Sequence, residues 1–314
     1  MAFAEFNLIQ QFFTRPAQRK GTRLSVGDDC ALLAIPEGYE LAITTDTMVE
    51  NVHFFPDVPP EQLGYKLLAV NLSDLASMGA EPIAITLALT MPEVDAEWLQ
   101  AFASGLFALA DKYQLDLIGG DTTSGPLTLS IQAMGLVPDN QALKRSAAKV
   151  GDLIYVTGCI GDAGLGLKIK QGYACLDMQQ ALQRFNKPEP RIQEGLELRS
   201  LANACIDISD GLAADLGHIL SKSAVGAKLD YAQIPMSAAV TNYLQETGDW
   251  QMPLIAGDDY ELCFTINAEN VGRLNISCTC IGIIEDERGL RITYHGETSI
   301  FNKSGFEHFN TENK

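Results

Sequence analysis

The chain has 314 residues, of which 46% are hydrophobic, so it can form one large domain or two of ordinary size, and the composition argues against disorder. Its 22 basic and 40 acidic residues leave a formal net charge of −18. This charge argues against nucleic acid or an anionic membrane as the main partner, because both would repel it. It agrees with a protein that collects cations, although a solvated acidic surface explains most such excesses.

Apolar spacing in the first half predicts three helices and four strands, which are helices over 5–13, 59–79 and 95–113 and strands over 41–46, 82–91, 115–121 and 127–137. We expect the strand over 41–46 to be buried. Proline at the start and Gly79 at the end delimit the second helix. A basic segment over 142–152 follows, and we place a domain boundary within it, giving domains 1–149 and 150–314.

The second half predicts strands over 152–158, 204–210, 227–232, 261–266 and 278–284, and helices near 191–203 and over 211–223. A glycine-rich turn, "GDAGLGLKI", follows the first of these strands, and a polar stretch precedes the strand over 261–266. Because several adjacent strands lack an intervening helix, an α/β fold with mixed sheets is favoured over a simple doubly wound one.

The seven cysteines include one close pair, "CTC", which lacks the two-residue spacer of zinc and redox motifs. We therefore interpret them as reduced core residues of a cytoplasmic protein. No apolar run reaches membrane-spanning length, and the early residues lack the basic region of a signal peptide.

Acidic residues recur at the edges of apolar runs, namely Asp28, Asp29, Asp46, Asp121, Asp207, Asp210, Asp258 and Asp259. Any one of them is explained by the frequency of Asp in turns and helix caps. The set is harder to explain, because two carboxylates at about 4 Å repel by about 1 kcal/mol in water and by more when partly buried. Multivalent cations would remove that repulsion, and carboxylate and hydroxyl oxygens suit Mg²⁺ better than zinc.

Magnesium clusters commonly serve phosphates, so an anionic nucleotide is the expected ligand. Arg145 is an isolated basic group that could contact it, and the glycine-rich turn could offer backbone N–H groups at a helix start. The P-loop and protein-kinase motifs are absent from the sequence, which argues against those two kinds of site.

Six motifs occur in order over nearly the whole chain: "VGDDCAL", "ITTDTMVENVHF", "KLLAVNLSDLASMGAEP", "LIGGDTT", "DISDGLAADLGHI" and "GDDYELCF". Together they resemble the thiamine-monophosphate kinases, which share a superfamily with aminoimidazole ribonucleotide synthetase. The resemblance implies a two-domain α/β fold, a homodimer formed by the N-terminal halves, and ATP-dependent phosphorylation of thiamine monophosphate to thiamine diphosphate. For this reaction we expect direct in-line transfer without a phosphoenzyme, because the sequence offers no activated nucleophile and the phosphate of the acceptor supplies its own.

The resemblance also implies roles for individual residues. The magnesium ligands would be Asp29, Thr44, Thr45, Asp46, Asp74, Asp121, Asp207 and Asp210, with Asp28 orienting them or acting through water. Gly120, Asp121, Arg145 and Ser209 would contact ATP, and His53, Asp258 and Phe306 would contact the substrate.

Two residues depart from the family pattern, since Asp258 is commonly Glu and Phe306 is often Trp or Tyr. His53 could instead be a packed imidazole and Phe306 an anchor for the tail. Two alternatives to the kinase stay open at this point: another ATP-using enzyme of the superfamily, such as the amidine-forming ribonucleotide synthetase, and a non-catalytic nucleotide- or metal-binding protein.

Overall fold

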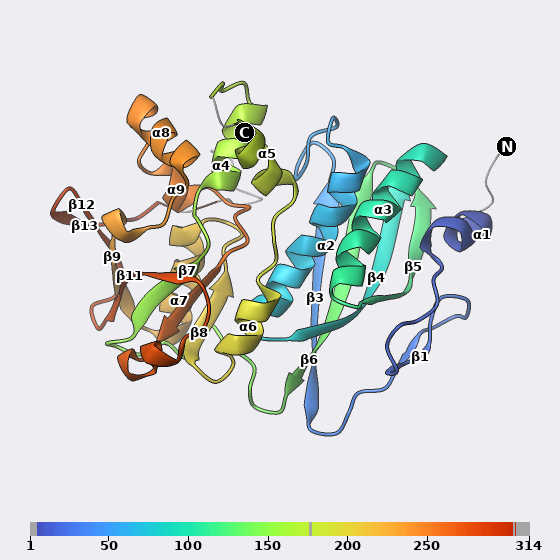
Figure 1. Cartoon of the computed structure of the whole chain (residues 1–314), viewed down its shortest axis with the longest axis horizontal. Coiled ribbons are helices and arrows are strands. Elements are labelled where there is room, and N and C mark those ends of the chain that lie inside the picture. The colour runs from blue at the N-terminus through green and yellow to red at the C-terminus, as the bar shows by residue number, and fades with distance from the viewer. Residues whose placement is uncertain (1–4, 176–177, 304, 306–314) are drawn as a thin grey trace. The chain divides into compact units, whose positions relative to one another are not determined.

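The computed structural model describes residues 5–175, 178–303 and 305 (Figure 1). The chain forms two compact units, the first made of residues up to 75 together with 80–140, the second of residues 76–79 together with those from 141 onward. The division thus falls at 140/141, whereas the basic segment suggested 149/150. Among the described residues, none of the helices has both the length and the apolar character needed to cross a bilayer.

The first unit contains, in chain order, α1 (Glu5–Leu8), the short π-helix η1 (Ile9–Phe13), β1 (Thr22–Leu24), β2 (Leu32–Leu33), β3 (Tyr39–Val49), α2 (Pro60–Ser77), β4 (Glu81–Met91), α3 (Ala96–Lys112), β5 (Asp116–Ser124) and β6 (Thr128–Pro138). All seven elements predicted for this half are present. The strands β1 and β2 form a separate small pair.

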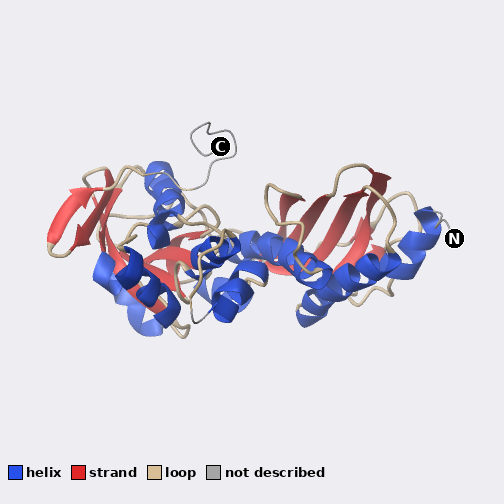
Figure 2. Cartoon of the chain, turned by 90° about the horizontal axis from the view of Figure 1, so that it is seen from above, coloured by secondary structure: helices blue, strands red, loops and turns tan. Residues whose placement is uncertain are grey.

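The main sheet of this unit has the order β3-β6-β4-β5, with β4 and β5 parallel and the other neighbours antiparallel. This confirms the expected mixed sheet. Helices α2 and α3 lie together on one face of the sheet (Figures 1 and 2). They approach closely at Gly64 and Gly105, where an added Cβ would lie 2.1 Å from Phe102 O and 1.8 Å from Glu61 O. Asp95 caps α3 by accepting from two N–H groups of its first turn.

The expectation of a buried strand over 41–46 was wrong. That segment belongs to β3, which is longer, lies at the edge of the sheet and alternates between half-buried and exposed side chains. Ile43 is 56% exposed on the face turned away from the helices. The segment is therefore part of an edge strand with one face largely exposed.

The second unit contains β7 (Leu153–Thr157), α4 (Asp162–Lys170), α5 (Met178–Asn186), α6 (Ile192–Leu198), β8 (Ala202–Asp207), α7 (Leu212–Ser223), β9 (Gly226–Asp230), η2 (Tyr231–Gln233), α8 (Ala238–Thr247), α9 (Met252–Ile255), β10 (Leu262–Ile266), η3 (Ala268–Arg273), β11 (Cys278–Glu285), β12 (Gly289–Tyr294) and β13 (Glu297–Ile300). The sheet order is β13-β12-β9-β11-β7-β10-β8, and only β12 and β9 pair in parallel.

One apolar core joins α7 to this seven-stranded sheet, and a smaller one joins α4, α5, α8 and α9. The stretch interpreted as polar contains α8 and α9. Only three residues of α8 are buried, Ala239, Val240 and Tyr243, which explains why its apolar pattern was weak. The helix expected near 191–203 is shorter, ending at Leu198.

Candidate active site

The first acidic cluster lies between β3 and α2. The Thr44 hydroxyl donates to the Asp74 carboxylate, and the Asp46 N–H donates to Asn71 Oδ1 at 3.2 Å. Burial, together with the negative charge of Asp74, raises the pKa of Asp46 from 3.8 to about 7. Two carboxylates that disfavour each other's ionisation are the arrangement a divalent cation would relieve.

A second group of acids lines a cavity of about 900 Å³ in the same unit. Asp28 and Asp29 come from the loop between β1 and β2, and Gly120 and Asp121 come from β5. Gly120 is required there by the fold, because an added Cβ would lie 1.8 Å from Leu87 O on the neighbouring strand.

The pleat of β3 separates Thr45 from its neighbours. Thr44 and Asp46 point toward α2, whereas Thr45 accepts from Gln132, a residue of the cavity wall, at 3.4 Å. The side chains suggested as magnesium ligands in this unit are thus divided between the two faces of the sheet.

Asp46 and Asp121 lie inside strands, and not at strand ends as the sequence suggested. Both strands continue three residues beyond them, to Val49 and Ser124. His53 lies in the turn after β3, half-buried, and its Nδ1 accepts from the Val49 N–H at 3.0 Å. Since Nδ1 is an acceptor, the proton of a neutral His53 sits on Nε2.

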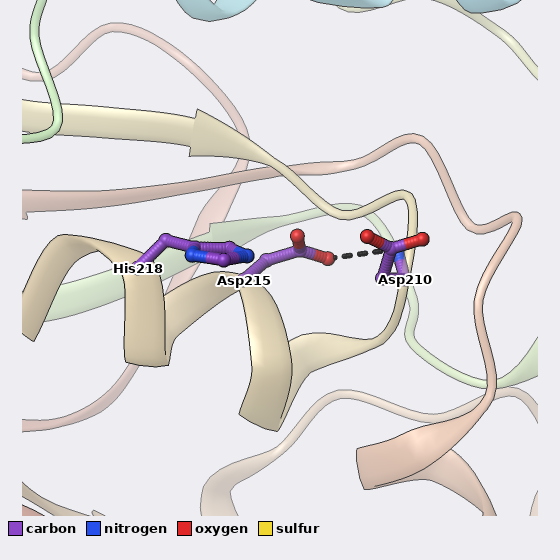
Figure 3. Close-up of side chains that lie close together, drawn as sticks. All are labelled: Asp210, Asp215 and His218. Carbon is purple, nitrogen blue, oxygen red and sulfur yellow. Dashed lines mark hydrogen bonds between the residues drawn. The ribbon is translucent and has the colours of Figure 1, made fainter. Parts of the chain in front are cut away.

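A third cluster lies in the second unit, where β8 ends at Asp207 and α7 begins (Figure 3). A single oxygen of Asp215, Oδ2, accepts from the N–H groups of Ser209, Asp210 and Gly211 at 3.0–3.1 Å. Asp215 is 2% exposed, and burial raises its pKa from 3.8 to about 7, against the lowering effect of those N–H groups. It fixes the turn that carries Ser209 and Asp210.

His218 lies one turn further along α7, and its ring nitrogen, an Asp215 oxygen and an Asp210 oxygen lie within 4.8 Å of one another. Asp215 and His218 were not among the site residues predicted from the sequence. The spacing in "DGLAADLGHI" could have indicated them. Asp215 follows Gly211 by four residues, which places it near the start of its own helix, and His218 follows Asp215 by three residues, which places both on one side of that helix.

The glycine-rich turn does not offer its N–H groups to phosphate, so that hypothesis was wrong. It forms the start of α4, where Asp259 accepts from Gly161 N–H at 2.7 Å and from Ala163 N–H at 3.2 Å. Asp259 is 2% exposed, and burial raises its pKa to about 8. An internal carboxylate therefore occupies the position where an anionic ligand would bind.

The remaining residues suggested by the sequence are spread over the second unit. Arg145 is exposed, and its carbonyl accepts from Ser223 Oγ at the C-terminal end of α7. Ser209 is held at the other end of this 12-residue helix, about 18 Å away along its axis. Asp258 is half-buried beside Ser209, whose carbonyl accepts from its N–H at 2.9 Å. Phe306 lies outside the described residues.

Comparison with known proteins assigns the family. The AIR synthase related protein N-terminal domain matches residues 27–137, and the corresponding C-terminal domain matches residues 149–295. The thiamine-monophosphate kinase of Salmonella typhimurium is 47% identical, over 99% of this chain and 100% of that protein.

Two solved structures resemble the chain along most of its length. The crystal structure of thiamine-monophosphate kinase from Stenotrophomonas maltophilia K279a is 43% identical, with a TM-score of 0.85, and the match covers 95% of this chain and 99% of that one. AaThiL complexed with AMPPCP and TMP is 29% identical, with a TM-score of 0.79, and the match covers 88% of this chain and 89% of that one. The chain therefore belongs to the AIR synthase related proteins and, among them, to the thiamine-monophosphate kinase family.

Proposed function

We propose that the protein transfers the γ-phosphoryl group of ATP to thiamine monophosphate and so forms thiamine diphosphate, the last step of thiamine diphosphate biosynthesis. The full-length match to thiamine-monophosphate kinases carries this proposal. AaThiL, a structural relative, is described in complex with AMPPCP and TMP, which is the substrate pair this reaction requires.

Several Mg²⁺ ions are the cofactor we propose, and the donor set fits them, because it consists of carboxylate and hydroxyl oxygens. The raised pKa of Asp46 supports this assignment, since a neighbouring cation would offset the charge of Asp74. When bound, the ions would neutralise charge on the two polyanionic substrates. The residues proposed to hold them are Asp29, Thr44, Thr45, Asp46, Asp74, Asp121, Asp207 and Asp210, with Thr45 able to reach the Asp46 cluster through its backbone only.

The nucleotide contacts we propose are Gly120, Asp121, Arg145 and Ser209. Gly120 leaves its backbone accessible at the cavity, and Arg145 offers an exposed guanidinium. Because the starts of α4 and α7 are occupied by Asp259 and Asp215, we do not assign the phosphates of ATP to either helix start.

For the acceptor we propose His53, Asp258 and Phe306 as contacts. Nδ1 of His53 accepts from the Val49 N–H, so the proton of its neutral ring is on Nε2, the nitrogen that we propose faces the substrate phosphate. A phosphate monoester is ionised near neutral pH, so its oxygen can attack the γ-phosphorus in line without a strong general base. The side chains therefore position the two substrates, and no covalent enzyme intermediate is needed.

The first unit would supply metal, nucleotide and dimer contacts, and the second unit would complete the site. We propose a homodimer formed through the edge strand β3, whose Ile43 is 56% exposed on the face turned away from the helices. A cytoplasmic location is supported by the seven cysteines, all within the described residues and all without a disulfide partner there.

The direct test is incubation with ATP, Mg²⁺ and thiamine monophosphate, followed by separation of the thiamine phosphates. Thiamine diphosphate should accumulate in step with ADP, and omission of Mg²⁺ should abolish both. ATP binding without any turnover of thiamine monophosphate would contradict the proposal and favour a binding protein. Aminoimidazole formation from the substrate of the ribonucleotide synthetase would favour the other enzyme of the superfamily.

A further inference from the structure

The segment from Asp258 to Glu261, between α9 and β10, has an alternating backbone conformation. Asp258 and Tyr260 both have positive φ angles, 70° and 51°. Residues that have a Cβ atom rarely adopt this left-handed backbone conformation, and they do so only where surrounding contacts stabilise it. The alternation turns Asp259 and Glu261 inward, at 2% and 0% exposure, while Asp258 and Tyr260 stay half-buried.

The two inward carboxylates anchor the segment to the helices around it. Asp259 accepts from the first N–H groups of α4, as described above. Glu261 accepts from Arg184 of α5 and, through both oxygens, from Arg191 at 2.6 Å, and it also accepts from the Thr157 hydroxyl. A buried carboxylate with bidentate guanidinium contacts has a fixed position, so the backbone on either side of Tyr260 is fixed as well.

The backbone of the same segment is tied to the turn that follows β8. The Asp258 N–H donates to Ser209 O at 2.9 Å, and the Tyr260 N–H donates to Ile208 O at 2.8 Å. In return, the Ile208 N–H donates to Glu261 O at 2.8 Å. Asp258 is therefore held next to Ser209, one of the residues proposed to contact the nucleotide.

The Tyr260 hydroxyl donates to Asp258 Oδ1 at 3.0 Å. We propose that Tyr260 is a positioning residue, which fixes the Asp258 carboxylate in the orientation that receives the cationic, N–H-bearing thiamine moiety. This inference rests on the proposed function, in which Asp258 contacts thiamine monophosphate. Aspartate is one methylene shorter than the glutamate common in the family, so its orientation limits which groups it can reach, and the phenol sets that orientation.

The test is Tyr260→Phe, which removes one hydrogen-bond donor and keeps the ring. The KM for thiamine monophosphate should rise about three- to tenfold, with the KM for ATP changed by less than about twofold. In an Asp258→Ala background the same substitution should have no further effect on the KM for thiamine monophosphate, because the group that it orients is gone.

The chain offers a matched control in Tyr243, whose hydroxyl donates to Asp249 Oδ2 at 2.9 Å in the small helical core. Tyr243→Phe removes the same kind of bond and should leave both KM values unchanged. Wild-type turnover, measured first, tests the proposed function by itself. Given that turnover, an unchanged KM in Tyr260→Phe, or an equal rise with and without the Asp258 carboxylate, overturns the positioning role alone.

Discussion

Asp215 and Asp259 satisfy the N–H groups of helix starts in different ways, so one substitution should affect them differently. Asp215 uses only Oδ2, which accepts from three N–H groups, whereas Asp259 uses one oxygen for each of two N–H groups. An asparagine has one acceptor oxygen and one amide nitrogen. Asp215→Asn can therefore keep all three bonds, but Asp259→Asn must place its amide nitrogen against an N–H donor.

The size of the effect is obtained by comparing the stability of the Asn variant with that of the Ala variant at each position. Both substitutions remove the carboxyl group, so the free energy of its ionisation cancels in this comparison. Each bond to a backbone N–H contributes about 0.5–1.5 kcal/mol, so Asp215→Asn should be more stable than Asp215→Ala by about 2–4 kcal/mol. At position 259 the one retained bond is offset by the clash of two donors, so the Asn and Ala variants should differ by less than about 1 kcal/mol.

The four variants should be compared by thermal and urea unfolding in EDTA, so that bound metal does not contribute. The expected difference at position 215 corresponds to roughly 4–16 °C in Tm. Near-equal stability of Asp215→Asn and Asp215→Ala would refute the single-oxygen geometry. If Asp259→Asn were more stable than Asp259→Ala by as much as Asp215→Asn is more stable than Asp215→Ala, the proposed contrast between the two helix starts would be refuted.

Three further outcomes follow from the first unit. The pKa of Asp46 is raised from 3.8 to about 7, so between these values the folded chain keeps a proton that the unfolded chain has lost. Metal-free stability should therefore fall as the pH rises from about 4 to about 7, and Asp46→Asn should flatten that decline in urea titrations. Gly120→Ala should shift β5 against Leu87 and abolish turnover, whereas Gly119→Ala, with nothing within 4 Å of its added Cβ, should keep near-wild-type activity. Ile43→Lys should convert a dimer to a monomer in sedimentation equilibrium at micromolar concentration; an unchanged dimer would place the interface elsewhere.

The sequence predicted the helices and main strands of the first unit well, because α2, α3 and β4 are long and rich in apolar residues. It misplaced Asp46 and Asp121 at strand ends. Aspartate is depleted in strands, so each of these acids looked like the end of its strand, whereas the edge strands β3 and β5 each contain one. Local pattern alone therefore could not show that β3 continues to Val49.

The error at the glycine-rich turn has a different cause. Gly161 and Ala163 lie 98 and 96 positions from Asp259, the residue that occupies their N–H groups. A local motif shows that a helix start can bind an anion, but it carries no information about which distant carboxylate folds against it. By contrast, the contact between Asp215 and Gly211 spans only four residues of "DGLAAD", and it was nevertheless not predicted from the sequence.

These two helix starts bear on how a strongly acidic protein can bind two phosphorylated substrates. In a P-loop, backbone N–H groups at a helix start hold the phosphates directly. In this fold the starts of α4 and α7 hold the protein's own carboxylates, Asp259 and Asp215, and acids again line the cavity of the first unit. A polyanion that approaches such surfaces is repelled unless cations lie between them. The dependence on metal that we propose agrees with this arrangement, since the backbone N–H groups at these two helix starts are already occupied by aspartates.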